Sequence, residues 1–130
     1  MTFRWILPVL LLLTACTKEA PTINAQWGTP EYVATQFLQA LYIDKDLDKA
    51  KGLSTTEYAQ LMESYGTVRQ VGRTLMNMSF DTVEIRVNRT GGNLREQYEN
   101  EAAIDILLTG PHGSKQVDEL RTVELVRSGN

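Results

Sequence analysis

The hydrophobic positions of the chain change their period once, from helical spacing in the first half to strict alternation in the second. Apolar residues recur every three or four positions from Val33 to Leu41, which predicts an amphipathic helix reaching about Ile43. Thr29 is suited to cap the free N–H groups of this helix, and Pro30 is suited to its first position. We therefore expect a helix to open the folded domain.

A short second helix is predicted directly after the first. It should run from Leu47 to Lys51, because Asp46 can cap its N-terminus and Gly52 favours its end.

The third helix is predicted to be long. Ser54 and Glu57 have the spacing of a capping box, in which the hydroxyl and the carboxylate each satisfy a backbone donor. Apolar residues then continue at steps of three or four to Met76, with a bend expected near Gly66. Gly72 lies on the apolar stripe, so we expect another element to approach the helix closely there.

After Asn77 the period changes to two, which is typical of half-buried strands. Alternation over residues 83–87 predicts one strand, and alternation from Tyr98 to Leu108 predicts a second, with a turn at residues 91–93.

The last strand is predicted from about Gln116 to Arg127, after a turn at residues 110–113. Its alternation is less clean, and we expect a bulge near Arg121 to bring its apolar residues into phase. Three helices followed by three long antiparallel strands predict an α+β domain, with the helices packed on one face of the sheet.

The chain begins with a different kind of segment. Residues 1–15 combine Arg4, a short apolar run and small residues, which are the marks of a secretory signal. The sequence Leu13-Thr-Ala-Cys16 resembles the lipobox of bacterial lipoproteins and contains the only cysteine. That resemblance implies cleavage before Cys16 and acylation of its thiol. An ordinary signal peptide with an incidental cysteine is the alternative.

The lipid anchor defines the expected location and boundaries. Thr17 follows the cysteine, which by resemblance to Gram-negative lipoproteins implies transfer to the periplasmic face of the outer membrane. In a Gram-positive host the anchor would instead lie on the outer face of the plasma membrane. Residues 16–28 then form a lipidated tether, and residues 29–130 form the domain itself. Trp27 is expected to dock on the domain, with a position near the lipid as the alternative.

Composition narrows the classes of partner. Loss of Arg4 with the signal leaves 12 basic and 16 acidic side chains, a formal charge of −4. This balance gives no electrostatic reason to bind nucleic acid. With one cysteine in the chain no internal disulfide forms, so packing must hold the core together.

Residues 28–42, together with residues 46–50 and 53–55, resemble the opening of NTF2-like (cystatin-like) domains, most closely the small DUF4878-like lipoproteins. The resemblance implies a curved antiparallel sheet of three or more strands that can enclose a pocket with the helices. The superfamily includes enzymes, ligand binders and assembly modules, so the fold does not decide the function. Its enzymes place Asp and His pairs in the pocket, and this chain lacks a candidate pair.

The candidate chemistry is sparse. His112 is the only histidine and is expected at an exposed turn, and Asp44, Asp46 and Asp48 lack the glycine and glutamate of a calcium loop. We expect no cofactor and no metal site. Arg69 and Arg73 lie four residues apart and could bind an anion, although a solvated helix face is the favoured explanation.

Tyrosines are the remaining candidates, because each combines an apolar ring with a polar hydroxyl. Those that could line a pocket are Tyr42, Tyr58, Tyr65 and Tyr98, with ordinary core packing as the alternative.

We therefore predict an envelope lipoprotein with a non-enzymatic domain that binds an apolar small molecule or another protein. As an alternative, the domain is an assembly module that docks through its sheet to an envelope complex or to a second copy as a homodimer. An enzyme is the least favoured class, and it would require carboxylates such as Glu101 or Asp105 in a cavity.

Overall fold

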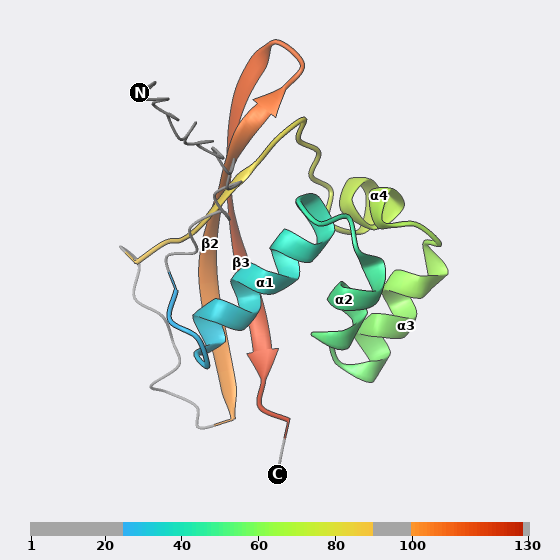
Figure 1. Ribbon diagram of the computed structural model, residues 1–130, viewed down its shortest axis with the longest axis vertical. Helices are drawn as coiled ribbons and strands as arrows, with labels where there is room; N and C mark the ends of the chain where they lie inside the picture. Colours follow the sequence, from blue (N-terminus) through green and yellow to red (C-terminus); the bar gives the residue numbers. More distant parts are fainter. Residues whose placement is uncertain (1–24, 90–99, 129–130) are drawn as a thin grey trace, which may run out of the picture.

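The computed structural model describes residues 25–89 and 100–128, which form helices followed by a three-stranded antiparallel sheet in the order β1-β2-β3 (Figure 1). The predicted α+β class is confirmed. The helical elements are α1 (Pro30–Tyr42), α2 (Leu47–Gly52), α3 (Thr56–Ser64), α4 (Val68–Gln70) and the π-helix η1 (Val71–Leu75). The strands are β1 (Glu84–Val87), β2 (Glu101–His112) and β3 (Lys115–Val126).

The first two helices begin where their caps predict. The Thr29 side chain accepts a hydrogen bond from the Tyr32 N–H at 3.3 Å, and Asp46 accepts one from the Lys49 N–H at 3.0 Å. Gly52 is the last residue of α2 rather than the residue that follows it. Both N-terminal predictions are confirmed, because each cap acts within four residues of chain and needs no tertiary partner.

The predicted long third helix is wrong in two respects. The cap is Thr55, whose hydroxyl accepts from the Tyr58 N–H at 3.3 Å, whereas Ser54 donates to the Ala50 carbonyl at the end of α2. The helix is also interrupted rather than bent, since Gly66 adopts a φ of 83° and ends the first segment. Glycine enters this left-handed region at little cost, which makes it a natural helix terminator. Thr67 then caps a new helix.

The long hairpin of β2 and β3 differs from its prediction in two features, the bulge and the turn. Pairing is continuous from Glu101 opposite Val126 to His112 opposite Lys115, so the bulge expected near Arg121 is absent from this ladder. The turn occupies residues 113–114, and the predicted turn at 110–113 is wrong because the strand continues through His112. Val117 is already in phase with the other half-buried residues of β3.

β1 is shorter than the strand predicted over residues 83–87, but the chain just before it stays close to β2. The Asp81 N–H donates to the Pro111 carbonyl at 2.8 Å, and the Gly113 N–H donates to the Asp81 carboxylate at 3.0 Å. A Cβ placed on Gly110 would lie 1.9 Å from the Thr82 carbonyl oxygen. Gly110 is therefore needed inside the strand, where the backbone before β1 crosses it.

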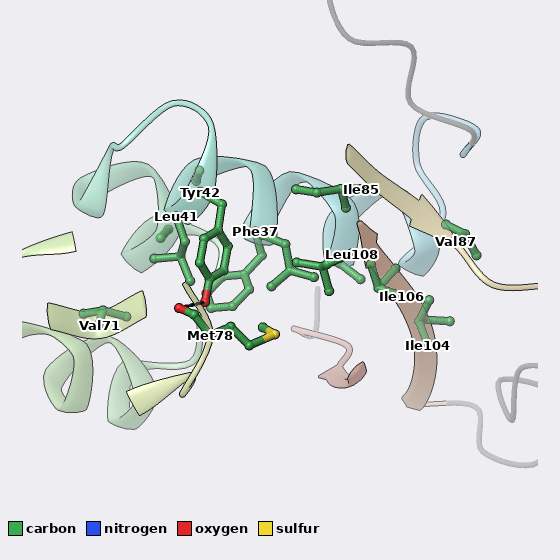
Figure 2. Packing of buried hydrophobic residues seen from close by; sticks show 14 of the residues in the cluster. Phe37, Leu41, Tyr42, Val71, Met78, Ile85, Val87, Ile104, Ile106 and Leu108 are labelled. Atoms are coloured by element: carbon green, nitrogen blue, oxygen red, sulfur yellow. Dashed lines mark hydrogen bonds between the residues drawn. The ribbon is translucent and has the colours of Figure 1, made fainter. Parts of the chain in front are cut away.

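The core lies between α1 and the inner faces of β1 and β2 (Figure 2). Helical spacing in α1 and two-residue alternation in the strands bring their apolar side chains to one shared layer. Its buried members include Leu38 and Leu41 from α1, Ile85 and Val87 from β1, and Ile104, Ile106 and Leu108 from β2. Met62, Val71 and Met78 extend the layer beneath the later helices.

Candidate functional site

Two groups of residues carry the candidate chemistry of the described structure. The first is a tyrosine cluster made of Tyr42, Tyr58 and Tyr65. The second is the edge of β3 that faces away from β2. Cys16 and Tyr98, two of the residues singled out from the sequence, lie outside the described residues.

Tyr42 is the centre of the tyrosine cluster. Its hydroxyl lies 3.2 Å from the Met78 carbonyl oxygen (Figure 2). It also lies 3.3 Å from the Gly72 carbonyl oxygen, so it can donate to either. Its ring packs edge-on against Phe80, with centroids 5.8 Å apart. A Cβ on Gly72 would lie 3.3 Å from this ring, which confirms that another element approaches the helix closely at Gly72.

Burial raises the pKa of Tyr42 well above its usual range. The charge of Arg121 opposes this shift, and the neighbouring Tyr58 adds to it. Burial also raises the pKa of Tyr58, and Tyr65 raises it further. The structure thus brings three of the four predicted tyrosines together, and burial raises the pKa of Tyr42 and Tyr58.

Tyr58 lies at the half-buried side of this cluster. Its hydroxyl lies 3.5 Å from the sulfur of Met76, and its ring packs edge-on against Phe37 with centroids 6.1 Å apart. A thioether is a weak acceptor, so the Tyr58 hydroxyl has capacity for a stronger partner. The Tyr58 ring therefore packs into the core, while its hydroxyl lies at the half-buried rim of the cluster.

Arg121 places a cation beside the cluster, on the inner face of β3. Its guanidinium lies 3.9 Å from the Glu119 carboxylate, and both side chains are a little over one-third exposed. The buried Nε atom of Arg121 has no hydrogen-bond partner among the described residues. The Arg121 guanidinium therefore has a buried N–H group without a hydrogen-bond partner among the described residues, which usually costs free energy.

The outer edge of β3 has no partner strand in the described part of the chain. β3 ends the sheet, since the strand order places only β2 beside it. The Arg127 N–H donates to the Asn100 carbonyl at 2.7 Å, so odd-numbered residues of this strand bond toward β2. In an antiparallel ladder the alternate residues bond the other way. Even-numbered residues from Gln116 to Val126 therefore turn their backbone N–H and C=O groups outward.

The outer face of the hairpin carries exposed apolar side chains at its middle. Leu107 lies directly opposite Leu120, and Leu120 is 54% exposed. Asp105 lies on this same outer face, where its carboxylate accepts from the Thr122 hydroxyl at 2.6 Å. Glu101 is exposed on the same face of β2. Both carboxylates therefore lie on the side of the sheet opposite the core.

The other residues singled out from the sequence lie apart from these groups. His112 is exposed beside the turn of the hairpin, and Arg69 and Arg73 are exposed on the helices. Asp44 forms an ion pair with Lys49 at 2.7 Å. Trp27 is 82% exposed, so the expectation that it docks on the domain is wrong.

Within residues 25–89 and 100–128 no group of three or more His, Cys, Asp or Glu side chains converges on a metal position.

Glu119 and Arg121, the charged pair on the inner face of β3, were not among the residues singled out from the sequence. The signal was present, because both residues are in phase with Val117 and Val123 on the face that should pack on the core. A charged pair in that phase is typical of an edge strand, whose inner face is only partly covered.

Comparisons with known proteins identify no relative. No family model, no curated protein and no solved structure matches this chain significantly. None of the helices in the described part of the chain has the length and hydrophobicity needed to span a bilayer.

Proposed function

We propose that this protein is a membrane-anchored, non-enzymatic interaction module that binds a protein partner along the free edge of β3. The observation that supports the proposal is the length of that edge, which presents outward backbone donors and acceptors over a twelve-residue strand.

An unpaired strand edge is a template for another strand. Main-chain hydrogen bonds provide affinity in such additions, and alternating side chains provide selectivity. Proteins that must not pair in this way usually protect the edge with proline, a bulge or a short strand. β3 has no proline and no bulge and is twelve residues long; of the protective features it carries only inward-pointing charges, Glu119 and Arg121, which in our proposal select among partner strands.

The rest of the proposed function concerns location and fold. We propose an NTF2-like domain with a curved sheet, carried by a lipid on Cys16 at the outer membrane or, in a Gram-positive host, on the outer face of the plasma membrane. Two or more acyl chains hold a protein stably on a bilayer. The segment between Cys16 and Gly28 would reach about 40 Å when fully extended, enough to let the domain meet partners away from the lipid surface.

The anchor is tested with Cys16→Ala in the full chain, expressed in a bacterial envelope. We expect the variant to lose acyl labelling and membrane retention together. Cys16→Ser serves as a second variant that retains a polar side chain. Persistent labelling of either variant would overturn the proposed anchor.

The binding edge is tested with Asp118→Pro. The N–H of residue 118 points away from β2, so proline there removes an outward donor without removing a bond of the β2–β3 ladder. We expect chemically cross-linked species of the wild-type full chain in membranes to disappear in this variant. Asp118→Ser is the matched control and should retain them. Equal cross-linking of Asp118→Pro and the wild type would contradict the proposal.

A second candidate function is the binding of an amphipathic small molecule at the tyrosine cluster. The specific observation in its favour is the guanidinium of Arg121 beside Tyr42, where an acidic head group could meet a cation next to aromatic rings. Native and denaturing mass spectrometry of the full chain tests it. A mass present only in the native spectrum supports the ligand, and identical masses in both spectra count against it.

A further inference from the structure

We infer that the partner of the β3 edge is β3 of a second copy, paired antiparallel about a two-fold axis at Leu120. The inference rests on the proposed function, in which this edge binds a strand, and it names the strand. A two-fold interface requires a surface that is complementary to itself, so the sequence of β3 can be tested for that property directly.

The backbone limits the registers available to such a pair. Even-numbered residues of β3 bond outward, so they must face even-numbered residues of the second copy. The two-fold axis must therefore pass through a residue rather than between two residues. Each residue of β3 then defines one possible register.

The register centred on Leu120 is complementary on the inner face of the sheet. Glu119 faces Arg121 of the second copy, and by symmetry Arg121 faces Glu119. Val117 faces Val123 in the same way on either side. Opposite charges and β-branched residues placed directly across strands each stabilise the pair, by roughly 0.2–1 kcal/mol per pair. Residues 115–125 take part, which is nearly the whole strand.

Neighbouring registers lack this complementarity. An axis at residue 119 would place Glu119 opposite itself, and an axis at residue 121 would place Arg121 opposite itself, with like charges adjacent in both cases. An axis at Val123 pairs Glu119 with Arg127 but keeps only residues 120–126 within the strand. Charge and overlap together therefore favour Leu120 over these three registers.

The outer face of the sheet supports the same register. Leu107 already lies opposite Leu120, so pairing Leu120 with itself forms a row of four leucines across the joined sheet. The exposed side chain of Leu120 would then lie between two apolar neighbours. On the inner face, a carboxylate from the second copy approaches Arg121, whose own Glu119 is 3.9 Å away.

The register is tested with Leu120→Cys in the full chain, with the wild-type chain as the baseline for Cys16. Facing residues of a hydrogen-bonded antiparallel pair have Cα atoms about 5.5 Å apart, within the range that a disulfide accepts. We expect oxidation to give a disulfide-linked dimer. Thr122→Cys is the matched control on the same face, and its copies would lie roughly 13 Å apart along the strands. It should not form the dimer, and equal dimer yields from both variants would overturn the register.

A charge exchange tests the same register without a new covalent bond. Glu119→Arg and Arg121→Glu each place like charges across the proposed interface, and each should lower the dimer fraction at least tenfold in sedimentation experiments on the detergent-solubilised full chain. The double variant restores opposite charges and should recover dimerisation. Circular dichroism checks that all three remain folded. Failure of the double variant to recover would overturn the proposed pairing of Glu119 with Arg121.

The outcomes also separate this inference from the proposed function. Cross-links from β3 to a different envelope protein, without the Leu120→Cys dimer, would overturn the self-pairing and leave the edge as a binding surface. Absence of any cross-link along β3, in the same membranes, would overturn both.

Discussion

β2 and β3 are strands of equal length, joined by a two-residue turn and paired without interruption, yet their inner faces differ. The inner face of β2 is apolar and fully buried at Ile104, Ile106 and Leu108. The inner face of β3 is only half-buried, and it includes Glu119 and Arg121. The two strands therefore share a hairpin but not an environment.

The difference follows from their positions in the sheet. β2 has strands on both sides and lies beneath α1, whereas β3 has a strand on one side and meets α1 less extensively (Figure 1). Alternation in a sequence shows which side chains share a face. It does not show whether that face, or the strand edge beside it, is covered.

The largest expected effect comes from truncating the β2 core. Ile106→Ala should lower the free energy of unfolding by about 2–5 kcal/mol, because it leaves a cavity in a fully buried layer. Leu120→Ala on the outer face is the matched control, and we expect a change within about 0.5 kcal/mol. Urea denaturation at low protein concentration measures both. Similar losses of unfolding free energy in the two variants would contradict the difference in burial between these two positions of β2 and β3.

A backbone substitution in β2 should have the next largest effect. Gly110→Ala places a Cβ 1.9 Å from the Thr82 carbonyl oxygen, so the chain before β1 must move. We expect destabilisation of about 1–3 kcal/mol in thermal or urea unfolding. Gly52→Ala, where the added Cβ meets nothing within 4 Å, should be neutral or slightly stabilising. Tolerance of alanine at residue 110 would show that the crossing is loose.

Tyr42 joins the end of α1 to the chain before β1 through buried hydrogen bonds. Tyr42→Phe removes the donor to the Gly72 and Met78 carbonyls and should cost about 1–2 kcal/mol at neutral pH. Tyr42→Leu, which also removes the ring packing on Phe80, should cost more than the phenylalanine variant.

The same residue predicts a pH dependence. Burial raises the pKa of Tyr42 in the folded protein, so in alkali the unfolded chain loses its proton first. Wild-type stability should be independent of this group at neutral pH and should fall as the pH rises above about 10. Urea midpoints measured from neutral to alkaline pH should fall more steeply for the wild type than for Tyr42→Phe. Parallel curves would contradict the assignment.

The smallest effect is expected on the inner face of β3. Arg121→Met keeps much of the apolar stem of the side chain and removes an Nε atom without a partner among the described residues. We expect monomer stability to change by less than about 1 kcal/mol. Urea denaturation at low concentration measures this change, and a loss above 2 kcal/mol would show that the guanidinium contributes to the core.

Local features of the fold were predictable from the chain. Thr29 and Asp46 cap their helices as expected, because a cap and the N–H group it satisfies lie only a few residues apart. Gly72 was predicted to accept a close neighbour, but the identity of that neighbour was not, because Tyr42 lies thirty positions away in the sequence. The Ser54 cap is wrong because the helix begins one residue later, with Thr55 as its N-cap, and the Ser54 hydroxyl instead donates to the Ala50 carbonyl.

The candidate site was less predictable. The sequence predicts that Tyr42, Tyr58, Tyr65 and Tyr98 could line a pocket. Only the packing shows that the hydroxyl of Tyr42 is buried. Nothing local in the sequence marks β3 as the final strand of the sheet. The phase of its apolar residues predicts a bulge near Arg121, although the ladder is continuous.

The first two helices, their caps and the change from helices to strands follow from the sequence alone, because hydrophobic period and caps act over a few residues. The lipobox-like segment around Cys16 also predicts a lipid anchor, and that prediction rests on the sequence alone. The position of β2 at the centre of the sheet and of β3 at its edge is known only from the tertiary structure. The same holds for the close approach of Gly110 to the Thr82 carbonyl. These outcomes depend on contacts between distant residues, which no local pattern encodes.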